Sequence, residues 1–352
     1  RMRRRAYDDG TAETAPSASC SSLAAESSTT TTTPAPPSPP PNKSIILTSP
    51  SAEKLASLLD EARRLHSRDR VLDARAIVDE IRSVLSHSDL LESTLFPSQR
   101  SLLDSITSES DRVRFMLDDL RNDDDDWIPC HSDAKRDIAV HYKNEEGSPI
   151  HAVKTRTILD GFSPRDFVNL ASLFVEADLM PLWFPGNMLK SCTVVAAPSV
   201  YRMALHMSMS FGRFSPLSDR DAAVEGRGYF LPDRNAALVL SRSIDRCDYI
   251  GGGTMPPPNR GVVRIDTFSA FYVELLPNDR VLLRFIARDD LKLKYVPSSF
   301  VNYLSQGAMP AEMIRCIVRA VRNCQGSEWE RRVRGRPEVY ADIERRAYGG
   351  CA

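Results

Sequence analysis

Few side chains in this sequence have the types and spacing that chemistry needs. His131, His141 and His151 stand ten residues apart, which is not a metal-ligand spacing. No Gly-x-Ser-x-Gly sequence is present to expose a nucleophilic serine. The glycines at 251–253 precede Thr254, Met255 and prolines, not the Lys-Ser/Thr of a phosphate-binding loop. We therefore expect no catalytic residues, no metal site and no cofactor.

The acidic clusters and the cysteines also have simpler interpretations than chemistry. Four adjacent aspartates at 123–126 lack the alternate spacing and the glycine turn of a calcium-binding loop, so they predict a solvated linker. Asp219 and Asp221 flank Arg220 and could be catalytic carboxylates, but a structural ion pair at a strand start is the favoured interpretation. The seven cysteines are odd in number and include no Cys-x-x-Cys pair. They predict a reduced, intracellular protein without disulfides or structural zinc.

Composition excludes several broad classes of protein. The formal net charge is −1, whereas a general nucleic-acid binder needs a basic surplus to neutralise phosphates. No apolar run approaches the roughly 18–20 residues that span a bilayer. The 352 residues suffice for two domains, and an apolar fraction of 42% allows a sizeable core in at least part of the chain.

Residues 1–49 are predicted to be a disordered, low-complexity tail. A Ser/Thr run leads into a proline-rich stretch, and such a segment cannot bury enough apolar surface to offset its ordering entropy. A plain spacer is favoured over a ligand for SH3 or WW domains. The basic start lacks the apolar region of a secretory signal; a transit peptide stays open, although acidic residues argue against it.

Residues 50–107 are predicted to be a helical hairpin region. Apolar residues recur at helical spacing on both sides of a charged link at 67–70. One helix pair cannot bury its own apolar face, so this region either docks on the next domain, which we favour, or binds a protein partner. A third helix is expected at 111–120. The hairpin pattern consists of Leu55, Leu58, Leu59, Ala62 and Leu65, then Val71, Ala74, Ile77, Val78, Ile81 and Leu85.

The chain changes to strand patterns after Trp127 and ends in another helix. Ser163-Pro164 predicts a helix start, with proline at the first helical position. The order of helix, strands, helix, many strands and long helix predicts an α+β fold with an antiparallel sheet, which the last helix covers. The expected strands are 137–142, 152–159, 194–197, 201–211, 222–230, 236–244, 262–276 and 280–288, and the last helix spans about 297–323.

The most informative segment is the strand at 201–211. Side chains alternate between the two faces of a strand, so one face of this strand is wholly apolar and contains three methionines. Methionine suits irregular, adaptable apolar surfaces. Ordinary core is one interpretation of this face, and the wall of a cavity is the other. The apolar face comprises Tyr201, Met203, Leu205, Met207, Met209 and Phe211.

Several short motifs occur in a fixed order over about residues 112–325. They are Glu176-Ala177-Asp178-Leu179 with Trp183-Phe184-Pro185, Ser218-Asp219-Arg220-Asp221, Gly261-Val262-Val263-Arg264-Ile265, Asp290-Leu291-Lys292, Val296-Pro297, Phe300-Val301-Asn302 and Ser305-Gln306.

In order and spacing, this set resembles the START domain, the steroidogenic acute regulatory-related lipid-transfer family. The resemblance implies a START-like lipid-binding domain at 108–326 and leaves 327–352 as a charged C-terminal tail. It also implies a helix-grip fold, in which a curved antiparallel sheet wraps a long C-terminal helix around an apolar tunnel.

The resemblance also implies site residues. The apolar face of strand 201–211 would line the tunnel, together with Leu283, Phe285 and Ala287, because Arg284 and Arg288 need the wet face. One stripe of the last helix would form the lid. The stripe is Met309, Met313, Ile317 and Val321, and the gating loop beside the entrance is Gly212, Arg213, Phe214 and Pro216.

One departure from the family concerns the ligand. Sterol-binding members resemble one another in a buried acid–arginine pair, and Met207 and Gly226 stand at the matching places here. This puts sterol in doubt and leaves phospholipid, sphingolipid, fatty acid or pigment open. Arg227 could substitute, but adjacent residues on a strand face opposite sides.

The sequence therefore predicts a cytoplasmic protein that binds a lipid or other hydrophobic ligand, for transfer or sensing. We expect transient contact with membrane surfaces and no nucleic-acid partner. The basic residues at 331–336 either touch anionic membrane or form a solvated end. Two alternatives stay open: an interaction scaffold with a collapsed cavity, and a cyclase- or hydrolase-like enzyme on the same fold.

Overall fold

The computed structural model describes residues 50–87, 95–121, 127–144, 151–211, 218–244, 254–292 and 308–348. The predicted N-terminal tail, the aspartates at 123–126, the gating loop at 212–216 and the glycines at 251–253 lie outside the described residues. So does the predicted start of the last helix at 297.

Three helices precede the sheet. α1 (Pro50–Ser67) and α2 (Val71–His87) form the predicted hairpin, and α3 (Pro97–Arg121) is longer than expected. The apolar residues predicted for the hairpin, such as Ala62 and Ile81, are buried against Leu103 and Ile106 of α3. A different side of α3 contributes Val113, Met116, Leu117 and Leu120 to a second apolar cluster, which it shares with the sheet.

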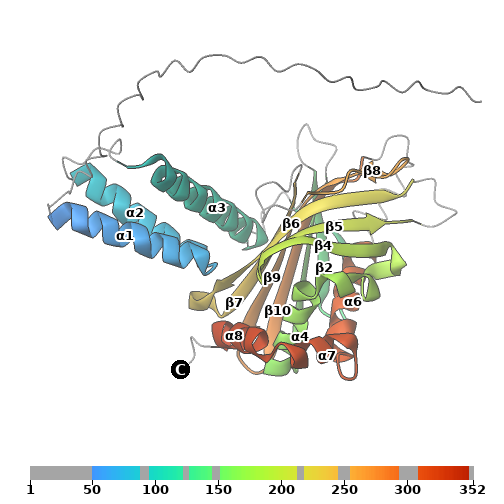
Figure 1. The fold of residues 1–352 in the computed structure, drawn as a ribbon. Helices are drawn as coiled ribbons and strands as arrows, with labels where there is room; N and C mark the ends of the chain where they lie inside the picture. Colours follow the sequence, from blue (N-terminus) through green and yellow to red (C-terminus); the bar gives the residue numbers. More distant parts are fainter. Residues whose placement is uncertain are drawn as a thin grey trace, which may run out of the picture. The chain divides into compact units, whose positions relative to one another are not determined.

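A curved antiparallel sheet dominates the rest of the chain, as predicted (Figure 1). Its strand order is β1-β2-β3-β10-β9-β7-β6-β5-β4, and among the described strands only the two-residue β8 pairs in parallel, with β6. The bounds are β1 Ile128–Asp133, β2 Ile138–Asn144, β3 His151–Asp160, β4 Leu189–Ser199, β5 Arg202–Met209, β6 Arg220–Leu231, β7 Ala236–Ser243, β8 Val263–Arg264, β9 Asp266–Leu276 and β10 Arg280–Asp290.

Sequence interpretation missed β1 and underestimated β4. β1 contains Pro129 and mostly polar residues that stay partly exposed, so no apolar alternation marks it. Only the antiparallel pairing with β2 reveals it as a strand. β4 is the last strand in the sheet order and exposes many of its side chains, which removes the same signal.

Helices pack on both faces of the sheet. α4 (Pro164–Val175) starts as predicted, because the Ser163 side chain caps the backbone of Asp166 and the Asp166 carboxylate accepts from the Ser163 backbone. α4 and α6 (Ala308–Arg322) join the main core cluster with strands β3, β9 and β10. Figure 1 shows these helices on the face of the sheet opposite to that of α3.

The outer face of β10 is not wet, contrary to the prediction. Arg284 Nη1 donates to the backbone carbonyl of Leu120 at 2.8 Å, and Arg288 pairs with Asp119. Both partners lie on α3, so this helix provides the polar contacts that we expected from water. The two arginines still point away from the inner face, as alternation along a strand requires.

The charged segment after 326 is folded rather than a solvated end. It forms α7 (Glu328–Gly335) and α8 (Pro337–Tyr348), which bury Trp329, Tyr340 and Ile343 in the main core cluster. Buried Glu176 accepts hydrogen bonds from Arg332, Arg336 and Tyr340 at 2.8–3.0 Å. The few apolar residues of this segment are widely spaced among arginines, so the local pattern concealed their packing.

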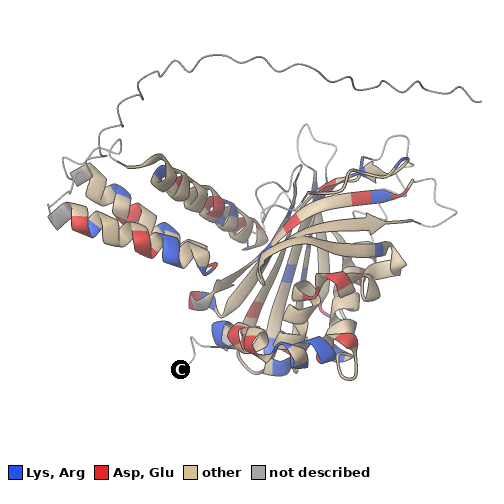
Figure 2. Cartoon of the chain, viewed as in Figure 1, with Lys and Arg blue, Asp and Glu red and all other residues tan. Residues whose placement is uncertain are grey.

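Charged side chains are frequent on the helices and sparse along β4 and β5 (Figure 2). Within the described residues, no helix is both long and apolar enough to cross a bilayer.

Candidate functional site

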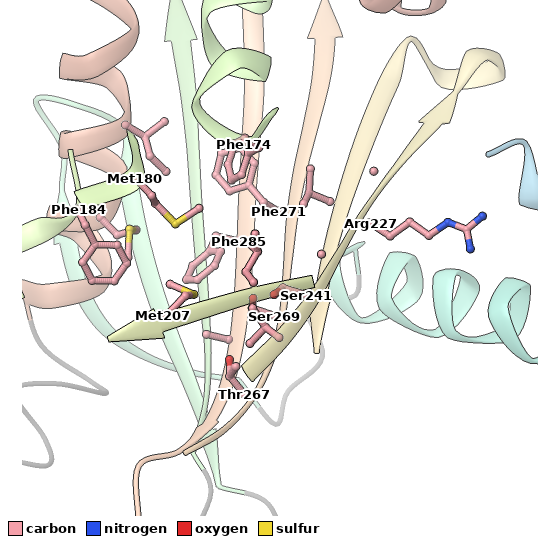
Figure 3. Close-up of a pocket in the computed structure, with 18 of the residues that line it drawn as sticks. Phe174, Met180, Phe184, Met207, Arg227, Ser241, Thr267, Ser269, Phe271 and Phe285 are labelled. Atoms are coloured by element: carbon pink, nitrogen blue, oxygen red, sulfur yellow. The ribbon is translucent and has the colours of Figure 1, made fainter. Parts of the chain in front are cut away.

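A cavity of about 500 Å³ lies inside this fold. That volume is within the range of about 300–1,000 Å³ that small-molecule sites occupy. Strands β5, β6, β7, β9 and β10 form one wall, and α4, α6 and the segment after α4 provide most of the rest, with Val153 of β3 and Ile343 of α8. The lining side chains are mostly aliphatic, aromatic or methionine (Figure 3).

Strand β5 presents its apolar face to the cavity. Met203, Leu205, Met207 and Met209 all line it. His206, from the alternate set, instead pairs with Asp221 outside the lining set. The other members of the predicted face, Tyr201 and Phe211, line the cavity just beyond the two ends of β5.

The residues predicted on β10 and the last helix divide into two groups. Phe285, Ala287, Met309, Met313 and Ile317 line the cavity, whereas Leu283 and Val321 do not. Leu283 is 1% exposed, and it belongs to the core cluster that α4, α6 and α8 share with the sheet. Leu283 is two residues from Phe285 on β10, so its side chain also lies on the inner face. At this position, however, helices pack against the sheet and leave no cavity.

Sequence interpretation did not assign α4 and the segment after it to the cavity. The apolar pattern of α4 predicted which side of this helix faces the core. It did not predict that part of this side would border a cavity. Phe174 approaches Phe271 of β9, with ring centroids 4.9 Å apart (Figure 3). The lining residues from this region are Phe167, Leu170, Ala171, Phe174, Val175, Met180, Trp183, Phe184 and Met188.

Four polar side chains stand together on the inner face of the sheet. Ser241 of β7 pairs in register with Ser269 of β9, and Thr267 of β9 pairs with Asp289 of β10. All four line the cavity, and the Thr267 hydroxyl donates to the Asp289 carboxylate. Burial within the protein raises the pKa of Asp289 above its usual value.

Arg227 borders the cavity at its backbone but directs its guanidinium away from it (Figure 3). Its Nη1 donates to Glu109 of α3 at 2.7 Å, and its Nη2 lies 3.0 Å from Asp69, between α1 and α2. Tyr229 also donates to Glu109, at 2.9 Å. Arg227 therefore ties the helical region to the outer face of the sheet and is not available to a ligand in the cavity.

The carboxylate of Asp221 takes part in ion pairs, but its partners lie outside the predicted Asp219-Arg220-Asp221 group. It pairs with Arg264 at 2.5 Å and with His206 at 3.0 Å. Burial raises its pKa, but the hydrogen bonds from Arg264 and His206 outweigh burial and hold the pKa below its usual value. Arg220 instead donates to the backbone carbonyls of Ser218 and Leu291.

The raised pKa of Asp289 predicts an unusual dependence of stability on pH. In the unfolded chain this carboxyl ionises at its ordinary pKa, about 3.9, and in the folded protein only at higher pH. Its contribution to stability is therefore full below the unfolded pKa and is lost as pH rises through the folded pKa, by about 1.4 kcal/mol per unit of difference. We expect Asp289→Asn to raise the free energy of unfolding at pH 7, by an amount that shrinks toward pH 4. Urea unfolding across this range measures it, and an equal effect at both ends would contradict it.

No protein-family model matches the sequence, and no curated protein matches it. Solved structures that resemble the chain include human STARD10, with 16% sequence identity over 62% of this chain and 81% of that chain and a TM-score of 0.49. Human StAR-related lipid transfer protein 5 matches with 15% identity over 61% and 96% of the two chains, TM-score 0.49. Norcoclaurine synthase from Thalictrum flavum matches with 14% identity over 49% of this chain and 86% of that chain, with a TM-score of 0.30. These three solved structures are each under 20% identical to this chain and match it with TM-scores below 0.5.

Proposed function

We propose that this protein binds one lipid or other hydrophobic molecule in the cavity and carries it between membranes or senses its presence. The observation that carries the proposal is the cavity itself, a partly open space of about 500 Å³ whose wall includes methionine, phenylalanine and leucine side chains. A well-packed core leaves few voids larger than a water molecule, so a space of this size is suited to an occupant.

The composition of the wall determines which occupant is stabilised. Removing a methylene group from water contributes about 0.8 kcal/mol, so a hydrocarbon chain gains affinity from each carbon that enters. Three methionines on β5 and two on α6 suit such a ligand, because their flexible thioethers adapt to irregular shapes.

The mechanism we propose is passive. α6 and the loop at 212–216 move apart at a membrane surface, the ligand enters, and the same elements close over it. The proposal includes a cytoplasmic location and transient, peripheral contact with membranes. No covalent step is required.

The two alternatives make different predictions about the cavity. An interaction scaffold with a collapsed cavity needs a space filled by its own side chains, and the open volume argues against it. An enzyme needs titratable groups that point inward, and Asp289 is one such group. An enzyme would release an altered ligand, whereas a carrier returns the molecule it received.

Native mass spectrometry of the full chain tests the proposal. The purified protein is incubated with vesicles of mixed lipids, re-isolated, weighed intact and then extracted. We expect one bound lipid per chain, with the mass of a lipid that was supplied. A clean apo mass would overturn the proposal in favour of the scaffold, and a bound molecule of altered mass would favour the enzyme.

A further inference from the structure

The four polar side chains in the cavity form a patch with a defined position. Cross-strand pairing places Ser241 beside Ser269 and Thr267 beside Asp289, on three adjacent strands. Ser269 and Thr267 are two residues apart on β9, so both face inward. Phe271, the next inward residue on β9, begins the aromatic part of the wall with Phe285 of β10.

Several polar atoms of the patch can form further hydrogen bonds. Thr267 donates to Oδ1 of Asp289, which leaves Oδ2 of that carboxyl for another partner. Among the residues that the structure describes, neither Ser241 nor Ser269 has a side-chain hydrogen bond recorded. Both serines are partly exposed and line the cavity, so their hydroxyls can bond to a ligand or to water that a ligand displaces.

The charge around the patch excludes one class of ligand. Arg227 is the single base among the described residues that border the cavity, and its guanidinium is bound to Glu109 and Asp69 on the outer face. Asp290, the other acid at the cavity, pairs with Lys292. Within the described part of the lining, an anionic phosphate would therefore meet a carboxyl group and no free cation, at a high desolvation cost.

We propose that this patch, Ser241, Thr267, Ser269 and Asp289, binds the hydroxyl end of a neutral lipid while its hydrocarbon lies toward Phe271 and Phe285. A carboxylic acid in its neutral form both donates and accepts, and the serine hydroxyls do the same. The patch thus matches a group that also donates and accepts, such as the hydroxyl of a sterol, a diacylglycerol or a ceramide. The patch could therefore recognise a hydroxyl group, although Met207 and Gly226 stand where sterol-binding members have an acid–arginine pair. This inference rests on the proposed lipid-binding function and deepens it.

Paired lipids that carry either a hydroxyl or its charged ester at the same place test the inference on the full chain. Phosphatidylcholine vesicles carry equal amounts of cholesterol and cholesterol sulfate, or of dioleoylglycerol and dioleoylphosphatidate. The protein is re-isolated, and bound lipids are extracted and quantified by mass spectrometry. We expect the wild type to retain at least one of the two hydroxyl lipids over its charged counterpart by about tenfold or more. Equal retention within both pairs, or preference for the charged lipids, would overturn the inference.

Variants of Asp289 connect that preference to the patch. Asp289→Leu is expected to lower retention of the hydroxyl lipid about tenfold, because the hydrogen bond is lost in an apolar surrounding. Asp289→Asn keeps the shape and the hydrogen-bonding atoms, so its retention stays within about threefold of the wild type. Asp266→Asn, which removes an exposed partner of Lys292 outside the lining set, is the matched control.

The outcomes separate the two proposals. If neither the wild type nor any variant retains a lipid, phosphatidylcholine included, the lipid-binding function itself fails. If the wild type retains hydroxyl lipids and Asp289→Leu retains them equally, lipid binding stands and the patch is not the recognition site. If the leucine variant does not fold, Ser269→Ala keeps the test decisive. It removes one hydroxyl of the patch, so retention of the hydroxyl lipid should fall, and unchanged retention would contradict the patch.

Discussion

Met207→Asp is expected to abolish lipid retention. Met207 lies on the inner face of β5, between Leu205 and Met209, which also line the cavity. A carboxylate there is either ionised in an apolar space or protonated at a cost, and its short side chain cannot reach water. A penalty of about 3 kcal/mol lowers occupancy more than a hundredfold. Native mass spectrometry after incubation with mixed-lipid vesicles measures the loss.

The matched control for this change is Thr193→Asp. Thr193 lies on β4, pairs in register with His206 of β5 and is exposed. It receives the same new charge outside the cavity, so lipid retention should equal that of the wild type. Met207→Gln serves as a milder variant if the aspartate variant does not fold, and it should reduce retention partially. Full retention by a folded Met207→Asp variant would exclude β5 from the ligand site.

Arg227→Met is expected to destabilise the protein by about 3–5 kcal/mol, because it leaves buried carboxylates without their base. Glu109 and Asp69 are each less than one-tenth exposed, and both contact the Arg227 guanidinium at 3.0 Å or less. Free energies of unfolding from urea titration measure the loss. Adding Glu109→Gln to the variant should recover part of it, since one uncompensated charge is then removed.

The loss of stability caused by Arg227→Met should depend on pH, and the pKa of Glu109 determines in which direction. Burial raises the pKa of Glu109, but hydrogen bonds from His66 and Tyr229 and the charge of Arg227 outweigh burial, so its pKa lies below the usual value. The stabilisation by Glu109 is therefore present above the unfolded pKa and is lost as pH falls through the lower folded pKa. The destabilisation caused by Arg227→Met should shrink in acid.

An exposed ion pair provides the comparison for the Arg227 experiment. Arg63 and Asp60 pair at 2.9 Å on the surface of α1, where such pairs contribute about 0–1 kcal/mol. Arg63→Met should therefore change stability little. An Arg227→Met variant no less stable than Arg63→Met would show that the buried network does not hold the helical region to the sheet.

The sequence by itself determined the elements whose patterns are local. The apolar periodicity of residues 55–85 predicts α1 and α2, and Ser163-Pro164 predicts the start of α4. The alternation at 201–211 predicts an apolar strand face because side chains on a strand must alternate, and that face lines the cavity. These features depend on neighbours in the chain, so the chain order alone reveals them.

Only the tertiary structure decided which apolar faces meet one another and which leave a space. Leu283 and Phe285 have the same parity on β10, yet helices cover one and the cavity borders the other. α7 and α8 seemed by pattern to be a charged end, but Trp329 and Ile343 enter the core. Asp289 and Ser241 are far apart in sequence and meet through the pairing of β7, β9 and β10. The cavity volume and the closeness of these polar residues arise from the packing of segments far apart in the sequence, so no local sequence pattern reveals them.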